Sequence, residues 1–270
     1  MFQAAPTGKT SAIGLRLVAI ALTAGLLAPV FVLSSCGEPS REGARAAGAT
    51  RAAPGRQVAL ELPAANGGPL HYLLYLPRTY QRGKRMPLLL YLHGADRLGT
   101  GRRALSRVRR QGIPKAVDGR TAFPFIAVSP QTHTRWDPAQ LVKLLDVIQR
   151  RYAVDASRVY ATGFSLGGYG VWDLAMAYPR RFAAVAPLAD GPGSRRARCR
   201  PRPPARWAFH GTAARVVPAS ESKAMVRTVR RCGAYARLTL YPRAGHFVAE
   251  RTYGKRSLYR WLAATERSRP

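Results

Sequence analysis

The residues best suited to do chemistry lie in one short stretch, Gly163-Phe164-Ser165-Leu166-Gly167. The apolar run 158–164 has the composition of a strand, and the segment 166–178 has the pattern of a helix. A Gly-x-Ser-x-Gly turn between a strand and a helix is typical of a nucleophile elbow, where small residues allow a sharp turn that exposes the serine hydroxyl. The stretch therefore predicts Ser165 as a nucleophile.

A neutral serine hydroxyl is a weak nucleophile, so this chemistry requires a base within hydrogen-bonding reach. His246 follows the last predicted strand, 236–241, and comes after Ser165 in the chain. The other histidines are weaker candidates, because they lie within a strand, before a glycine at a strand end, or in a loop: His71, His93, His210 and His133. We expect His246 to be the base, and the alternative is a histidine in a surface loop.

Strand-like and helical segments alternate after residue 57. The predicted strands are 58–62, 70–76, 88–93, 125–129, 158–164, 183–188, 206–209 and 236–241. The predicted helices are 138–151, 166–178, 220–231 and 257–265. This alternation predicts an α/β fold with a mostly parallel central sheet and helices on both faces. The first two strands resemble an antiparallel hairpin at one edge.

Two backbone amides are candidates for binding the negative oxygen that nucleophilic attack would create. In a parallel sheet, ligands bind beyond the carboxyl ends of the strands. His93-Gly94-Ala95 follows the apolar run 88–92, so the Ala95 N–H can approach a substrate there. The Leu166 N–H, directly after the serine and at a helix N-terminus, is the second predicted donor.

These motifs resemble the α/β-hydrolase superfamily, and most of all its bacterial esterases: the polyhydroxybutyrate depolymerase-like, feruloyl-esterase-like and prolyl-oligopeptidase-like sequences. The resemblance covers about residues 57–265 and rests on YLHGADRLG, SPQTHTRW, DASRVYATGFSLGGYGVWDLAMAYPRRFAAVAPLADG, WAFHGTAARVVPASES and LYPRAGH. It implies Ser165 as nucleophile, His246 as base, and Leu166 with Ala95 as oxyanion donors. It implies no metal and no organic cofactor.

The sequence departs from this family at the acid that usually orients the histidine. Ala214 stands where a segment such as His-Gly-x-x-Asp-x-x-Val-Pro carries its aspartate, and Phe247 stands where an acidic residue often follows the histidine. Asp190 ends the strand after the elbow helix and is the candidate for a relocated acid. Two further alternatives stay open, which are Glu221 or Glu250 in this role, or no carboxylate at all.

The first 36 residues have the pattern of an export signal. Lys9 precedes an almost wholly apolar run, 13–33, and Arg16 lies near its start. Small residues then lead to Cys36, as in a bacterial lipobox. We expect a lipoprotein anchored through Cys36 and facing the periplasm or the cell exterior. An ordinary cleaved signal and a retained anchor helix are the alternatives. Residues 37–56 are expected to be a flexible tether, and residues 57–270 the hydrolase domain.

The formal net charge of +31 favours anionic partners, an anionic membrane surface among them. The densest arginine cluster, 195–206, is interrupted by prolines and is expected to be a solvated loop. No pattern of a specific nucleic-acid-binding motif accompanies it. Cys199 and Cys232 could pair in an oxidising compartment, or remain free thiols.

Together these features predict an exported serine hydrolase that cleaves small or polymeric esters. The alternative is a catalytically impaired domain of the same fold that binds anionic envelope components or polysaccharide through its arginines. A peptidase is a weaker third reading. The sequence leaves the substrate and the oligomeric state open.

Overall fold

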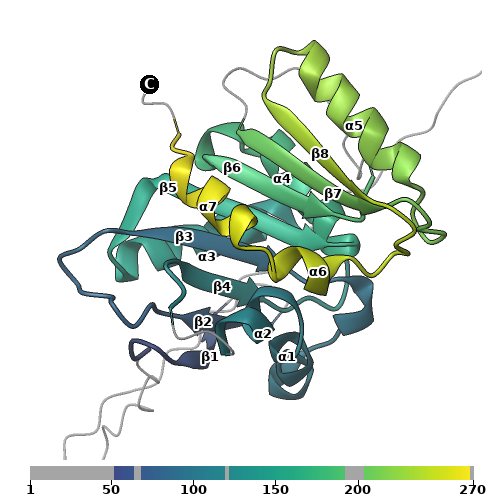
Figure 1. Ribbon diagram of the computed structural model, residues 1–270. Coiled ribbons are helices and arrows are strands. Elements are labelled where there is room, and N and C mark those ends of the chain that lie inside the picture. Colours follow the sequence, from purple (N-terminus) through teal and green to yellow (C-terminus); the bar gives the residue numbers. More distant parts are fainter. Residues whose placement is uncertain (1–51, 64–67, 119–121, 192–203, 268–270) are drawn as a thin grey trace, which may run out of the picture. The chain divides into compact units, whose positions relative to one another are not determined.

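A computed structural model describes residues 52–63, 68–118, 122–191 and 204–267 (Figure 1). The predicted signal segment with Cys36, most of the predicted tether, Cys199 and most of the arginine cluster lie outside these ranges. Residues Gly48–Pro270 form one compact unit that contains the whole sheet. None of the described helices combines the length and the apolar character that a membrane span requires. Cys232 is disulfide-bonded.

The core is an eight-stranded sheet in the order β1-β2-β4-β3-β5-β6-β7-β8. Its strands are β1 (Gln57–Leu62), β2 (Leu70–Tyr75), β3 (Met86–Leu92), β4 (Ile126–Pro130), β5 (Val154–Phe164), β6 (Ala184–Leu188), β7 (Ala205–Gly211) and β8 (Ala236–Tyr241). β2 runs antiparallel to both of its neighbours, and all other paired strands are parallel. The predicted mostly parallel sheet with a hairpin at one edge is confirmed.

Helices cover both faces of this sheet, as predicted (Figure 1). One face packs against α1 (Gly101–Arg109), α2 (Gly112–Asp118), α6 (Ala249–Tyr253) and α7 (Arg256–Ala264). The other packs against α3 (Pro138–Arg151), α4 (Leu166–Ala177) and α5 (Ala219–Arg231). Two short 3₁₀ helices, η1 (Ala95–Arg97) and η2 (Pro179–Arg181), complete the described elements. Because both faces are covered, β3 is buried along its whole length and its sequence is continuously apolar.

A local signal explains where α3 begins. The Asp137 side chain accepts a hydrogen bond from the Ala139 N–H, and Pro138 occupies the first turn of α3, as expected for a capped helix start. The helices α1, α2 and α6 were not predicted. The signal of α1 is a short apolar stripe, Ala104, Leu105 and Val108, among arginines.

Candidate active site

The turn at Ser165 has the strained geometry of a nucleophile elbow. Ser165 has φ 53° and ψ −117°, in a region that residues with side chains rarely adopt. A Cβ at Gly163 would lie 2.4 Å from the Gly167 carbonyl oxygen, and a Cβ at Gly167 would lie 1.9 Å from the Leu92 carbonyl oxygen. Only glycine therefore fits at both positions, and the turn holds the serine at the carboxyl end of β5.

His246 reaches this serine from the loop between β8 and α6. Its Nε2 lies 2.9 Å from the Ser165 Oγ. Only 8% of His246 is exposed, and its ring contacts that of Phe164 at a centroid distance of 5.1 Å. Burial lowers the pKa of His246, His210 lowers it further, and Asp96 acts in the opposite direction. The imidazole is thus neutral near pH 7 and able to accept a proton.

The two amides predicted as oxyanion donors both lie at this end of the sheet. No hydrogen bond among the described residues occupies the N–H of Ala95 or of Leu166. The Thr132 N–H donates to His93 Nε2, so His93 Nδ1 carries the ring hydrogen and donates it to the Gly94 carbonyl at 2.8 Å. The Gly94 carbonyl and the Ala95 N–H belong to the same planar trans peptide and point in opposite directions. Fixing the carbonyl therefore also fixes the direction of the N–H.

The structure does not bring Asp190 to His246. Asp190 is fully buried after β6, and its Oδ1 accepts hydrogen bonds from Trp172 Nε1 at 3.0 Å and from Ser222 Oγ at 3.0 Å. Burial raises the pKa of Asp190 to about 7, against the hydrogen bonds from Trp172 and Ser222. The sequence alone places Asp190 at the carboxyl end of its strand. The side-chain rotamer that brings its carboxylate to Trp172 and Ser222 depends on how α4 and α5 pack.

No described residue takes the place of the orienting acid. His246 Nδ1 is buried and has no hydrogen-bond partner. Glu250 instead forms an ion pair with Lys115, and Glu221 lies in the first turn of α5. The loop that carries Ala214 does run beside the histidine loop, because the Ala213 N–H donates to the Ala244 carbonyl at 2.9 Å.

One residue near the site, Asp96, has a role that the motifs did not indicate. Asp96 accepts from Gln111 at 2.9 Å and is the carboxylate whose charge acts on His246. Its position directly after the oxyanion loop was the available signal. His210, a weaker candidate for the base in the sequence, is fully buried and hydrogen-bonded to Ser222 Oγ and to the Val217 carbonyl. The described residues contain no cluster of three potential metal ligands.

Comparisons with known proteins agree with this architecture. Residues 64–269 match the Esterase family, described as "Putative esterase". Poly(3-hydroxyalkanoate) depolymerase C of Paucimonas lemoignei is 28% identical over 116 residues, which is 39% of this chain and 28% of that protein. The chain therefore spans little more than a quarter of the curated relative it matches.

Solved structures share the fold. The crystal structure of a thermostable esterase matches with a TM-score of 0.61 and 24% identity, covering 78% of this chain and 63% of that one. The feruloyl esterase module from Clostridium thermocellum, complexed with sinapinate, matches with a TM-score of 0.57 and 14% identity, covering 75% and 88%. The family match extends through all of the parallel strands and both loops that meet at Ser165. The chain therefore belongs to this esterase family and has the α/β-hydrolase fold.

Proposed function

We propose that this protein is an exported serine esterase in which Ser165 is the nucleophile and His246 the base. The observation that supports this most directly is the 2.9 Å contact between the Ser165 Oγ and the His246 Nε2. Family membership supports hydrolysis of an ester, and the strained turn supports a serine held out for attack.

The proposed reaction has two halves. The Ser165 Oγ attacks the ester carbonyl carbon while its proton passes to His246 Nε2, and the carbonyl oxygen becomes an oxyanion that the N–H groups of Ala95 and Leu166 bind. His246 then gives the proton to the departing alcohol, leaving an acyl-serine. Water attacks this acyl group with His246 again as base, which releases the acid and restores Ser165. Loss of one oxyanion donor typically costs roughly 10²–10³ in kcat.

The missing acid predicts a slow enzyme. When Nε2 accepts the serine proton, Nδ1 carries the other ring hydrogen, and that N–H is buried without an acceptor. No described carboxylate hydrogen-bonds to the imidazolium that forms during attack. In a serine protease, spoiling the acid lowers kcat by about 10⁴, yet catalysis well above the rate in water remains.

The surface beside the site favours an apolar ester. Phe247 is 76% exposed and Val216 is 71% exposed, and each lies on a loop at the carboxyl end of the parallel strands. The Phe247 ring also lies 5.8 Å from that of Phe164. Such exposed apolar side chains can pack against an acyl chain or a polyester surface. Export, with lipid attachment at Cys36, remains part of this proposal.

The test is turnover of a p-nitrophenyl ester together with labelling by a fluorophosphonate probe. We expect Ser165→Ala to abolish both, while Ser220→Ala, which alters an exposed serine at the start of α5, leaves them intact. Turnover that persists in Ser165→Ala would contradict the proposed nucleophile.

The absent acid also favours a second candidate, a catalytically impaired domain that binds anionic envelope components or polysaccharide. Wild-type labelling separates the two functions, because a fluorophosphonate reacts only with an activated serine. An unlabelled, folded wild-type protein would favour the binding function.

A further inference from the structure

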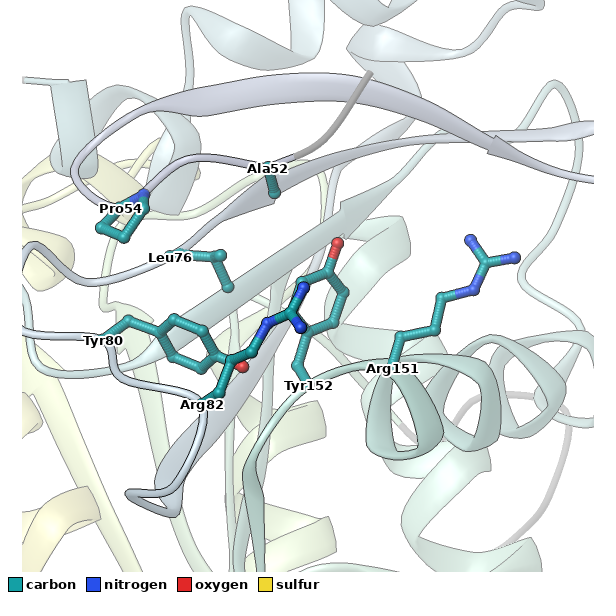
Figure 2. Close-up of a pocket in the computed structure, with 7 residues that line it drawn as sticks. All are labelled: Ala52, Pro54, Leu76, Tyr80, Arg82, Arg151 and Tyr152. Atoms are coloured by element: carbon teal, nitrogen blue, oxygen red, sulfur yellow. The ribbon is translucent and has the colours of Figure 1, made fainter. Parts of the chain in front are cut away.

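A pocket lies far from Ser165 in the fold. It has a volume of about 300 Å³ and is lined chiefly by Arg82, Arg151, Tyr80, Tyr152, Leu76 and Pro54. Figure 2 shows these side chains, with Arg151 extending from the last turn of α3. The walls are therefore aromatic and aliphatic, and the charged groups are both guanidinium groups.

The direction of the strands places this pocket at the opposite end of the sheet from the proposed active site. Arg82 precedes β3 and Tyr152 precedes β5, so both lie at the amino ends of parallel strands. Leu76 follows β2, which runs antiparallel to β4, and it pairs with Pro54 just before β1. Ser165 follows the carboxyl end of β5. A ligand in this pocket would thus leave the serine accessible.

The two arginines are available to a ligand. Both are exposed, and no carboxylate among the described residues lies within ion-pair distance of either. Arg151 lies in the last turn of α3, where a cation also offsets the partial negative charge of the helix end. Four further exposed cations lie within three residues of these lining residues in the chain: Arg78, Lys84, Arg85 and Arg150. The site is strongly cationic and can bind an anion.

The aromatic wall is formed before any ligand arrives. The Tyr80 and Tyr152 rings meet edge to face at a centroid distance of 6.2 Å. The Ala153 N–H donates to the Tyr80 hydroxyl at 3.0 Å, which fixes that ring against the start of β5. A preformed pocket loses little conformational entropy on binding.

We propose that this pocket binds the phosphate of an anionic phospholipid headgroup. Guanidinium groups match phosphate oxygens in charge and geometry, and they bind them through paired N–H donors. The partly exposed rings of Tyr80 and Tyr152 would contact the glycerol and the first methylenes of the lipid. Rim cations would lie near neighbouring headgroups, where each contributes to attraction to an anionic surface.

Connectivity favours a lipid over a soluble phosphate compound. Ala52 also lines the pocket, so the predicted tether and Cys36 are joined to the domain at this rim. Here the inference uses the proposed lipid anchoring, which would bring this end of the domain to a membrane. It does not depend on the proposed ester hydrolysis, because the pocket and Ser165 lie at opposite ends of the sheet.

Residues 48–270, which carry the whole sheet and its core, serve for the test. We would measure co-sedimentation with vesicles of phosphatidylglycerol and phosphatidylcholine, and with phosphatidylcholine alone. Arg82→Gln with Arg151→Gln should weaken binding to the anionic vesicles about 30-fold. The control, Arg227→Gln with Arg231→Gln, removes the same charge from exposed positions on α5 and should weaken it less than about threefold.

Several results would overturn the proposal. Equal losses in the two double variants would mean diffuse charge attraction, and equal binding to both vesicle types would mean that no anionic headgroup is recognised. Binding of inorganic phosphate that requires Arg82 and Arg151, without vesicle binding, would assign the pocket to a soluble phosphate compound. Both double variants should keep the wild-type melting temperature and ester turnover. An absence of ester turnover in the wild-type protein would contradict the proposed function and would leave the proposal for the pocket unaffected.

Discussion

The sharpest prediction concerns the position where the family resemblance expects an aspartate. Ala214 lies in the turn after β7, and this turn hydrogen-bonds to the histidine loop through the Ala213 N–H and the Ala244 carbonyl. Ala214 is partly exposed, so an aspartate there would keep some contact with water and pay little for desolvation. We expect Ala214→Asp to accept a hydrogen bond from His246 Nδ1 and to raise kcat/KM.

The magnitude follows from the present state of that nitrogen. His246 Nδ1 is buried without a partner. A hydrogen bond to a charged group contributes roughly 1.5–3 kcal/mol, and about 1.4 kcal/mol changes a rate tenfold. The gain should therefore be about 10- to 100-fold, below the roughly 10⁴ that an acid contributes in a highly evolved serine protease. The new charge should also raise the pKa of His246, so the acid limb of the pH–rate profile should move to higher pH.

The assay is kcat/KM for a p-nitrophenyl ester as a function of pH. Ala214→Asn has nearly the shape of the aspartate but no charge, and should give a much smaller gain. Ala213→Asp adds the same charge one residue away, at an exposed position, and should leave the rate near that of the wild type. An equal gain in Ala213→Asp would refute the reasoning, because it would mean a general charge effect. So would a folded Ala214→Asp protein with neither a faster rate nor a shifted pH profile.

The remaining predictions concern two carboxylates, Asp96 and Asp190. Asp96→Asn should keep an acceptor for Gln111 but remove the charge that raises the pKa of His246. The acid limb of the kcat/KM profile should therefore move to lower pH. An acid limb that does not move would argue against the electrostatic interaction between Asp96 and His246. Asp190→Asn should keep ester turnover within about threefold, because Asp190 does not touch His246. In the wild type the raised pKa of Asp190 means that the folded state binds its proton more tightly than the unfolded state, so stability should fall as the pH rises from about 4 to about 7. The loss should be about 4 kcal/mol at most, and urea unfolding of Asp190→Asn should show a flatter profile over that range.

Much of the fold was predictable because its signals are local. The continuous apolar run of β3 and the capped start of α3 depend only on neighbouring residues, and both were confirmed. The segment of α1 and α2 was harder to predict. Both helices are short, and α1 is rich in arginine, so their apolar residues can be recognised as core-facing only from the sheet face that they cover.

The sequence by itself determined which side chains could react and where. Gly163 and Gly167 dictate the sharp turn at Ser165, and chain order places His246 at the end of a later strand, so both fall at the same edge of a parallel sheet. Only the tertiary structure decided which hydrogen-bond partner each polar group has. Asp190 turns to Trp172 because α4 packs beside β6, a contact between segments that no local pattern encodes.

The same reason accounts for the pocket at the amino ends of the parallel strands. Its walls come from segments around Pro54, Arg82 and Arg151 that are far apart in the chain and meet only because β1, β2, β3 and β5 share one sheet. Local sequence patterns are set by a residue's near neighbours in the chain, whereas a cavity is set by the shape that packed elements leave between them. The sequence thus determined the reactive groups, and the packing of distant segments determined their partners.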